Sequence, residues 1–266
     1  MKITTLTENL TYDRDLLAEH GLSLLLESDS QSILFDTGQS SVFIKNANVL
    51  GKDLSNTDSL VISHGHYDHT GGIEFFLDIN NKARIYIKRE AFINKISKLK
   101  KVGMSLTKEI PPERVVYTNE ITSLNNEVYI VPSILPENFL CKKQNPGMYI
   151  EVGGIKSEDN FDDEQYLVIP GRDGISVISG CSHLGIVNII NDAVNRFKMP
   201  LNYILGGFHT SSAGEDEIAF LLNSLEKFNP KAIAVSHCTG LNVYCSILNK
   251  FSGKVFYNHT GKKFDL

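Results

Sequence analysis

Three histidines and one aspartate fall within six consecutive positions of the segment LVISHGHYDHTGG (60–72). His64 and His66 are two residues apart, so an extended segment points both side chains in the same direction. Asp68 and His69 follow in a bend that the neighbouring glycines make feasible. Neutral imidazoles and a carboxylate gathered around one turn suit Zn²⁺ or another borderline divalent ion. The alternative is a polar loop that is rich in histidine without binding metal.

Three later segments repeat one pattern, in which an apolar run is followed by small residues and a histidine. They are ISVISGCSH (175–183), NYILGGFH (202–209) and AIAVSHC (232–238). In open α/β sheets, ligands gather outside the carboxyl ends of the strands. Of the 8 histidines, only His20 and His259 lie outside these segments and the first cluster. The joint pattern therefore predicts one shared metal site.

The elements that must position these residues follow from apolar periodicity. Alternating and β-branched runs predict strands at 2–7, 22–28, 32–36, 59–63, 84–88 and 127–132. Residues 166–179 predict a hairpin, and residues 132–165 an irregular loop. Helical spacing predicts helices at 90–101, 185–197, 215–228 and 241–251. No linker divides the chain, so we expect one layered α/β domain over residues 1–266.

The composition is that of an ordinary globular protein, with 42% hydrophobic and 21% charged residues. A net charge of −5 provides no broad basic face, which argues against nucleic acid or an anionic membrane as a partner. No apolar run approaches the roughly 20 residues needed to span a bilayer, and the first residues lack the apolar core of a signal peptide. We therefore expect a cytoplasmic protein with reduced cysteines and a small-molecule substrate. The sequence leaves the oligomeric state open.

The motif SHGHYDHTGG (63–72) resembles the HxHxDH signature of the metallo-β-lactamase superfamily. ILFDTG (33–38) is similar to the aspartate-bearing strand end before that signature, and SHCTG (236–240) to the last metal-ligand histidine. Within the superfamily, GCSHLGIVN (180–188) and GGFHT (206–210) resemble the branch of dihydropterin–ribofuranosylaminobenzene-phosphate synthase-like proteins. The resemblance implies a four-layer αββα sandwich. It also implies one or two divalent ions at one edge of the β layers, with Zn²⁺ expected first and Fe or Mn as alternatives.

The resemblance further implies which residues bind these ions. His64 and His66 would bind a first ion, whereas Asp68, His69 and His237 would bind a second. An ion held in this way keeps a position for water and lowers the pKa of that water from about 15.7 toward 7. Asp68 would then orient the nucleophile as well as bind the ion.

The chain departs from the usual superfamily pattern at two positions. No histidine occurs between His69 and His183, where lactamase-type members place their third ligand. Either His183 takes that role or an acid such as Asp162 or Asp163 does. We prefer His183. Cys181 stands where a bridging carboxylate is usually found, and it is either a thiolate ligand for zinc or iron or a small buried thiol.

Three further residues lie beside these expected ligands in the sequence. We call residues 64–69 the chelating loop. Asp36 orients this loop through hydrogen bonds, or it caps a turn before Gly38. His209 is a metal ligand or, in the interpretation that we favour, a general acid or oxyanion donor that faces the substrate. Cys238 would point away from His237 if the strand continued, and we interpret it as a packing residue.

These features predict a metal-dependent hydrolase, in which a metal-bound hydroxide attacks an ester, lactone, amide or phosphodiester bond. The alternatives are an iron-dependent, dioxygenase-like redox enzyme and a synthase that condenses a pterin-type substrate. The lysines and arginines of residues 89–114 form either a lid that attracts an anionic substrate or the solvated face of a helix. The three-residue spacing of Lys95, Lys98 and Lys101 favours the helix.

Overall fold

The computed structural model describes residues 1–98, 100–141 and 147–266. The chain divides into two compact units. Unit 1 consists of Met1–Glu120, Asn145–Gln165 and His259–Asp265, and unit 2 of Ile121–Gln144, Tyr166–Asn258 and Leu266. Each unit has its own seven-stranded sheet and its own helices. The single domain expected over residues 1–266 stays a prediction.

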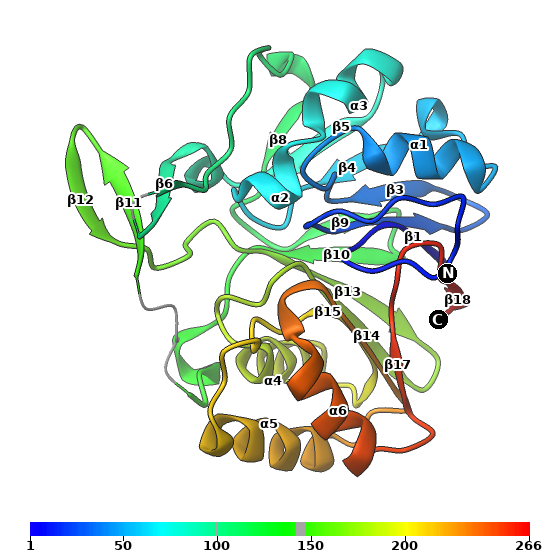
Figure 1. The fold of residues 1–266 in the computed structure, drawn as a ribbon, viewed down its shortest axis with the longest axis vertical. Helices are drawn as coiled ribbons and strands as arrows, with labels where there is room; N and C mark the ends of the chain where they lie inside the picture. The colour runs from blue at the N-terminus through cyan, green and yellow to red at the C-terminus, as the bar shows by residue number, and fades with distance from the viewer. Residues whose placement is uncertain (99, 142–146) are drawn as a thin grey trace. The chain divides into compact units, whose positions relative to one another are not determined.

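Unit 1 contains a mixed sheet whose parallel part carries the expected chelating loop (Figure 1). Its strand order is β18 (Lys263–Asp265), β1 (Lys2–Thr7), β2 (Ser23–Glu27), β3 (Ser32–Phe35), β4 (Ser59–Val61), β5 (Arg84–Ile87) and β8 (Val115–Tyr117). Strands β3, β4, β5 and β8 pair in parallel, whereas the other pairs are antiparallel. Parallel strands end at the same edge of a sheet, so Asp36 after β3 and His64 after β4 emerge together.

Helices cover one face of this sheet. They are α1 (Val42–Val49), α2 (Tyr67–Thr70) and α3 (Ile73–Ile79), with the short 3₁₀ helices η1 (Leu54–Asn56), η2 (Arg89–Phe92) and η3 (Pro112–Arg114). Phe43 of α1 and Phe76 of α3 pack in one buried cluster with Leu60, Ile62 and Ile85. Alternate residues of a strand share a face, so this cluster fixes which face of β4 and β5 packs against the helices. The position of the residues that follow β4 is fixed with it.

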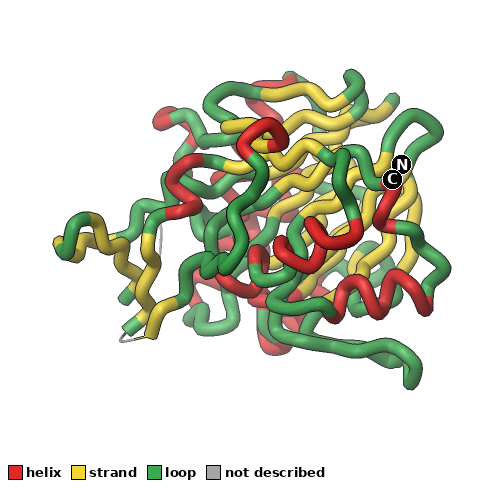
Figure 2. Tube along the Cα trace, turned by 90° about the horizontal axis from the view of Figure 1, so that it is seen from above, coloured by secondary structure: helices red, strands yellow, loops and turns green. Residues whose placement is uncertain are grey.

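A second, smaller sheet of unit 1 joins segments that are far apart in the sequence. Its order is β12 (Ile155–Glu158), β11 (Met148–Val152), β6 (Asn94–Ser97) and β7 (Lys100–Lys101), and its strands are yellow at the left of Figure 2. The helix predicted at 90–101 is therefore wrong, because antiparallel pairing of β6 with β11 overrides the helical spacing. The irregular loop predicted at 132–165 is wrong at β11 and β12, while its residues 142–146 lie outside the described residues.

Unit 2 contains a second mixed sheet with helices along it (Figure 1). Its strand order is β17 (Val255–Tyr257), β16 (Ala232–Ser236), β15 (Leu201–Gly207), β14 (Gly174–Ser179), β13 (Tyr166–Gly171), β10 (Val128–Val131) and β9 (Thr122–Leu124). Its helices are α4 (Ile186–Phe197), α5 (Glu215–Phe228) and α6 (Leu241–Lys250), with the 3₁₀ helices η4 (Pro136–Asn138) and η5 (His237–Thr239). Because β14, β15 and β16 run parallel, the segments that follow them leave the sheet at one edge.

The remaining elements expected from the sequence are confirmed. The six predicted strands correspond to β1, β2, β3, β4, β5 and β10, and the predicted hairpin to β13 and β14. The three later helices are α4, α5 and α6, each within one residue of its expected bounds. These elements were predictable because a regular apolar face decides each of them locally. In the part of the chain that the structure describes, no helix is both long and apolar enough to cross a membrane.

Candidate functional site

The expected site residues fall into two sets, one in each unit. Set 1, in unit 1, consists of Asp36, His64, His66, Asp68 and His69. Set 2, in unit 2, consists of Cys181, His183, His209 and His237. All of them except His209 are buried. Ionisable side chains lose the solvation of water on burial, so each set needs polar partners inside the protein.

Asp36 holds the chelating loop from the end of β3. Its Oδ1 accepts the backbone N–H of Ser63 at 2.7 Å, and its Oδ2 accepts the Ser63 hydroxyl at 2.6 Å. Oδ2 also accepts a hydrogen bond from Nδ1 of His69 at 2.6 Å. This contact places the proton of a neutral His69 on Nδ1, so Nε2 carries the lone pair that binds a metal ion.

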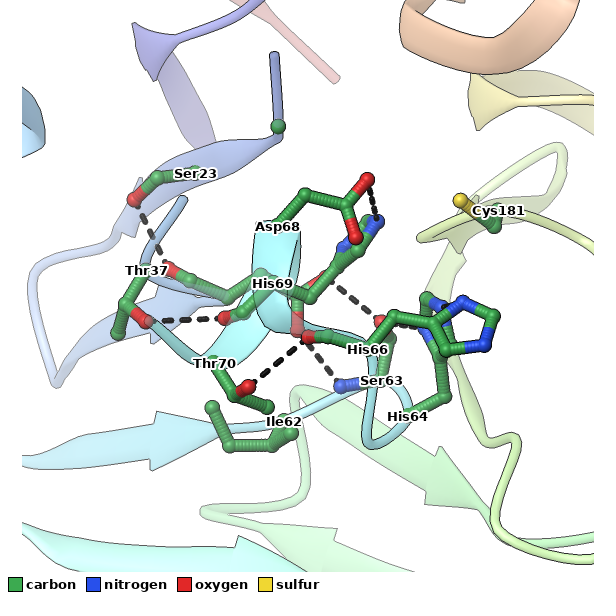
Figure 3. A network of polar contacts seen from close by, with 12 residues as sticks. Ser23, Thr37, Ile62, Ser63, His64, His66, Asp68, His69, Thr70 and Cys181 are labelled. Atoms are coloured by element: carbon green, nitrogen blue, oxygen red, sulfur yellow. Dashed lines mark hydrogen bonds and ion pairs between the residues drawn. The ribbon is translucent and has the colours of Figure 1, made fainter. Parts of the chain in front are cut away.

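Ser63 sets the tautomer of His64 in the same way. The hydroxyl group has one hydrogen, which it donates to Asp36, so its oxygen accepts a hydrogen bond from Nδ1 of His64 at 2.9 Å. Nε2 of His64 therefore carries a lone pair, like Nε2 of His69. It lies 3.0 Å from Nδ1 of His66. Figure 3 draws the two side chains next to each other. Such a separation suits two nitrogen ligands of one ion as well as a hydrogen bond.

His66 is neutral at pH 7. Burial lowers the pKa of His66 to about 4, and the nearby charge of Lys95 acts in the same direction, although Asp68 and Asp163 raise it. A neutral imidazole is the form that binds a metal ion.

Main-chain contacts fix the turn that presents these side chains (Figure 3). The hydroxyl and the backbone N–H of Thr37 both donate to the carbonyl oxygen of His69, each at 2.9 Å. The hydroxyl of Thr70 donates to the carbonyl oxygen of His66 at 2.9 Å. The N–H of Tyr67 donates to the carbonyl oxygen of Val102 at 2.9 Å, and Val102 directly follows strand β7 of the small sheet. The turn is therefore held by segments on both sides of it.

His20, which sequence reasoning missed, contacts Asp68. Nε2 of His20 lies 3.1 Å from Oδ2 of Asp68, and Nδ1 of His20 lies 3.3 Å from the side-chain nitrogen of Asn9. Nε2 of His69 lies 3.9 Å from the same Asp68 oxygen. His20 occupies a loop between β1 and β2, where no spacing of ligand residues marks it. Only the folded arrangement brings it to the chelating loop.

Asp163, one of the acids considered as a third ligand, has both carboxylate oxygens engaged within unit 1. Oδ2 accepts the backbone N–H of Gly65 at 2.7 Å, and Oδ1 pairs with Nζ of Lys95 at 2.9 Å. Lys95 also pairs with Asp159 at 2.7 Å. These contacts favour an anchoring role for Asp163, whereas Asp162 is exposed.

Lys95 does not lie on a solvated helix face, so that interpretation of residues 89–114 is wrong. Its side chain is 2% exposed, within strand β6. Burial lowers the pKa of Lys95, but the charges of Asp163 and Asp159 raise it more, and the resulting pKa is above the usual value. The ammonium group stays charged because two carboxylates replace its water.

Other positive side chains of residues 89–114 also have structural partners. The Arg89 guanidinium lies 3.8 Å from the centre of the Tyr117 ring, and Lys108 pairs with Asp78 at 2.6 Å. Arg114 donates to the carbonyl oxygen of Ala83 at 2.8 Å. A lid that attracts an anionic substrate would thus depend on the exposed lysines of this segment, and it stays a prediction.

Set 2 follows the parallel strands of unit 2. Cys181 and His183 come after β14, His209 after β15 and His237 after β16. The residues Cys181, His183 and His209 each have one donor atom within 4.8 Å of the other two donor atoms. The centres of the His183 and His209 rings are 4.1 Å apart. Ser182 lies between Cys181 and His183. Its hydroxyl group donates to the carbonyl oxygen of Gly207 at 2.6 Å, which connects the segment after β14 to the end of β15.

Cys238, for which strand alternation predicts a packing role, is one of a second group of possible ligands in unit 2. One donor atom each from Cys181, His237 and Cys238 lies within 4.8 Å of the other two. Burial raises the pKa of Cys238, but a hydrogen bond with Cys181 and the charges of His237 and His209 lower it more, so the pKa is well below the usual value. Its thiolate form is therefore favoured.

Backbone strain accompanies both sets. Asp36 has φ 59°, Ser182 60°, His209 51° and His237 52°, all in the left-handed region. Residues other than glycine adopt this region uncommonly, and such residues cluster at functional sites. Each of the four lies in a segment just after a strand, where the expected site residues also lie.

A family model for the metallo-beta-lactamase superfamily matches residues 17–237, most of the chain. The chain belongs to this superfamily. Both the HxHxDH motif and the segment that reaches His237 lie within the matched residues. Members of the metallo-beta-lactamase superfamily are generally enzymes and typically bind divalent metals. The resemblance drawn from the motifs is thereby confirmed.

Two relatives in Methanocaldococcus jannaschii align along nearly the whole chain. One is 28% identical over 282 aligned residues, which cover 98% of this chain and 95% of the relative. It is named 7,8-dihydropterin-6-methyl-4-(beta-D-ribofuranosyl)-aminobenzene-5'-phosphate synthase. The other is an uncharacterized protein, also 28% identical, with 98% of each chain covered. The first of these relatives has the name of the branch that the motifs of unit 2 resemble.

Solved structures confirm the α/β fold class of the superfamily, the αββα sandwich. The crystal structure of Tm1679, a metal-dependent hydrolase of the beta-lactamase superfamily, matches with a TM-score of 0.87 at 29% identity and covers 100% of this chain and 99% of its own. The metallo-beta-lactamase fold protein YhfI from Bacillus subtilis matches with a TM-score of 0.59 at 14% identity, with 99% of each chain covered. The second likeness shows the fold alone.

The donor atoms of both sets fit the divalent ions of the superfamily. Set 1 offers imidazole nitrogens whose tautomers are fixed by Asp36 and Ser63, together with the carboxylate of Asp68. Set 2 offers imidazole and thiol groups whose donor atoms are gathered within a few ångströms. Imidazole and thiolate suit zinc and iron, and carboxylate extends the choice to manganese.

Proposed function

We propose that the chain is a metal-dependent hydrolase that cleaves an ester, lactone, amide or phosphodiester bond of a small-molecule substrate. One observation carries the proposal. Asp36 and Ser63 form a hydrogen-bonded chain that fixes the rings of His64 and His69, so that each presents the lone pair of Nε2. A histidine that serves only packing does not need a buried carboxylate to set its tautomer.

The proposed metal ligands come from both sets: His64, His66, Asp68, His69, Cys181, His183 and His237. Asp36 supports them by hydrogen bonds. Zn²⁺ is the ion that we propose first, with Fe or Mn as alternatives and with one or two ions bound. When bound, such an ion acts as a Lewis acid that makes water a nucleophile at neutral pH.

The protein's own groups would perform the proton transfers. Asp68 has its carboxylate oxygen 3.1 Å from Nε2 of His20, and we assign it the role of orienting the attacking water. His209, half-buried beside His183, is assigned the role of donating a proton or a hydrogen bond to the substrate oxygen that gains charge. Both roles match the types of these groups, since a carboxylate accepts protons and an imidazolium donates them.

A synthase is the second candidate function. It is favoured by the relative of Methanocaldococcus jannaschii whose name is that of a dihydropterin and ribofuranosylaminobenzene-phosphate synthase. A condensation would join the exocyclic carbon of a pterin-type compound to an aromatic ribosyl phosphate, while a leaving group departs from that carbon and the aromatic partner loses a proton. It would use the same ligands, because a Lewis acid stabilises developing negative charge, here on the leaving group, in both reactions. The two functions differ in substrate and not in the metal ligands.

The experiment is a substrate panel with matched variants. The purified protein, with its metal content measured, is assayed on carboxylic esters, lactones, amides and phosphodiesters, and on a dihydropterin that carries a leaving group on its exocyclic carbon, with the ribosyl phosphate partner. We expect hydrolysis that a chelator abolishes and that His66→Ala abolishes together with bound metal. His259→Ala is the control, because His259 contacts Tyr12 and Thr260 and belongs to neither set.

The outcomes separate the candidate functions. Condensation of the pterin pair without hydrolysis of any panel compound would replace the hydrolase by the synthase. Full metal content in folded His66→Ala would contradict the assignment of set 1. Equal losses in His66→Ala and His259→Ala would show that the assay reports protein stability and not the site.

A further inference from the structure

The chain does not continue as a strand after Ser236. Strand β16 ends at Ser236, His237 has φ 52°, and the 3₁₀ helix η5 begins there. In a continuous strand, side chains at successive residues would point to opposite faces. The left-handed turn at His237 breaks this alternation. It therefore permits His237 and Cys238 to approach the same neighbours.

Gly207 leaves the space that the Cys238 thiol occupies. A Cβ atom at Gly207 would lie 2.6 Å from Sγ of Cys238 and 3.4 Å from Cδ2 of His237. The side chains of His237 and Cys238 thus both lie close to Gly207 at the end of β15. Sγ of Cys238 also lies 3.5 Å from the carbonyl oxygen of Cys181. Any larger residue at position 207 would push the thiol out of this position.

The backbone around Cys238 is held by its neighbours. Its carbonyl oxygen accepts the N–H groups of Thr210 at 3.1 Å and Ser211 at 3.2 Å. The hydroxyl of Thr239 donates to Ser236 at 2.8 Å and accepts the N–H of Phe208 at 3.0 Å. The loops after β15 and β16 are therefore tied together. A donor set on a fixed backbone binds an ion with little reorganisation.

We propose that Cys181, His237 and Cys238 bind one transition-metal ion through two thiolates and one imidazole. The donor atoms lie within 4.8 Å of one another, close enough for ligands that share an ion. The inference rests on the proposed function, and it adds Cys238 to the metal ligands. It also narrows the metal: two thiolates select Zn²⁺, Fe²⁺ or Co²⁺ over Mn²⁺, Mg²⁺ and Ca²⁺, which prefer oxygen.

Cobalt substitution tests this directly. The full-length protein is stripped of metal, loaded with Co²⁺ under a phosphine reductant, and its near-ultraviolet absorption is recorded. Bonds between thiolate and Co²⁺ give a charge-transfer band there, whereas imidazole and carboxylate do not. We expect this band in the wild type, with about half of its intensity in Cys238→Ser and in Cys181→Ser, because each variant removes one of two thiolates. The double variant should lack the band.

Cys245→Ser is the matched control, since Cys245 is an exposed cysteine on α6 of the same unit. Its band should equal that of the wild type. Circular dichroism establishes that each variant is folded. Alkylation provides a second measurement without any variant: Co²⁺ or Zn²⁺ should protect Cys238 from iodoacetamide, while Cys245 reacts equally with and without metal.

The outcomes distinguish this inference from the proposed function. A band that Cys181→Ser abolishes and Cys238→Ser leaves intact would overturn the role of Cys238 and keep a single thiolate ligand. Cobalt bound without any thiolate band would overturn the inference but leave the metal-dependent hydrolase standing. Failure of the wild type to bind any cobalt, zinc or iron would overturn both.

Discussion

Asp163 accepts the backbone N–H of Gly65 at 2.7 Å, across 98 residues of sequence. Gly65 lies between His64 and His66, so this hydrogen bond holds the centre of the chelating loop. The other oxygen of Asp163 pairs with Lys95 at 2.9 Å on strand β6 of the small sheet. The loop and the small sheet of unit 1 are therefore connected through one buried carboxylate.

Asp163→Asn should weaken metal binding as well as stability. A carboxylate accepts at both oxygens, but an amide has one acceptor, so either Lys95 or Gly65 would face an N–H group. Leaving a buried ion pair incomplete costs about 3 kcal/mol. We expect a loss of stability of this size in urea unfolding and at least tenfold weaker zinc binding in a competition titration.

Asp159→Asn is the control for this variant. Asp159 also pairs with Lys95, at 2.7 Å, whereas the N–H of Gly65 donates to Asp163. It should therefore lower stability while zinc affinity stays near that of the wild type. Equal losses of zinc affinity in both variants would show that the ion pair, and not the Gly65 contact, matters for the loop.

Gly65→Ala should disrupt the chelating loop by a steric clash. A Cβ atom at this position would lie 2.2 Å from the carbonyl oxygen of Ala91, which is backbone and cannot move aside as a side chain can. Overpacking of this kind costs about 1–3 kcal/mol. We expect a lower midpoint of thermal unfolding and a lower zinc content per protein molecule than in the wild type.

Gly214→Ala provides the matched comparison. Gly214 has φ −78° and no atom within 4 Å of its added Cβ, so the change in stability should be below about 1 kcal/mol with metal content unchanged. Wild-type zinc content in Gly65→Ala would contradict the tight packing of the loop on Ala91.

Asp36→Asn should reduce metal affinity without straining the backbone. Asparagine tolerates the left-handed conformation that Asp36 adopts at φ 59°, so the variant tests the carboxylate and not the turn. Loss of such a supporting hydrogen-bond acceptor typically costs about 10- to 100-fold in metal affinity. Isothermal titration with zinc measures this, and Asp29→Asn, at an exposed position, should bind as the wild type does.

The metal-free protein should lose stability as the pH falls from about 6.5 to about 4. Burial lowers the pKa of His66 from 6.5 to about 4, so below pH 6.5 the unfolded chain binds a proton that the folded protein does not. The stabilisation is present above pH 6.5 and is lost as the pH falls toward 4, by up to about 3 kcal/mol in total. Urea unfolding at pH 7 and pH 4.5, after treatment with a chelator, measures it. His66→Gln removes this titration, so the variant should show a smaller loss between the two pH values; an equal loss would contradict the pKa of His66.

Local sequence signals were sufficient for the fold class and for most of the candidate site. The spacing of His64, His66, Asp68 and His69 predicts a chelating loop by itself, and three strands that each end before a histidine predict set 2. Strand β4 and helix α4 have apolar patterns that no distant residue needs to support. Such signals are readable because neighbouring residues decide them.

The errors arose where distant residues decide the outcome. Lys95 lies in a segment with helical spacing, but it is buried in a strand because Asp159 and Asp163, 64 and 68 residues away, compensate its charge. His20 reaches Asp68 from a loop without any ligand spacing. The strand alternation that predicts a packing role for Cys238 does not reach it, because β16 ends at Ser236 and His237 has positive φ; the packing role itself stays a prediction. Each case depends on tertiary contacts that a local pattern does not encode.

The left-handed conformation of four residues within or beside the two sets, Asp36, Ser182, His209 and His237, lowers the stability of the fold at the positions where chemistry is expected. Each non-glycine residue held in this conformation costs roughly 1–3 kcal/mol, and glycine or asparagine would relieve much of that cost. In a library selected only for folded protein at high temperature, His209 and His237 should be replaced by glycine or asparagine within few rounds. A screen that also demands bound metal should keep His237. The difference in unfolding free energy between the proteins from the two selections would then measure how much stability the site costs the fold.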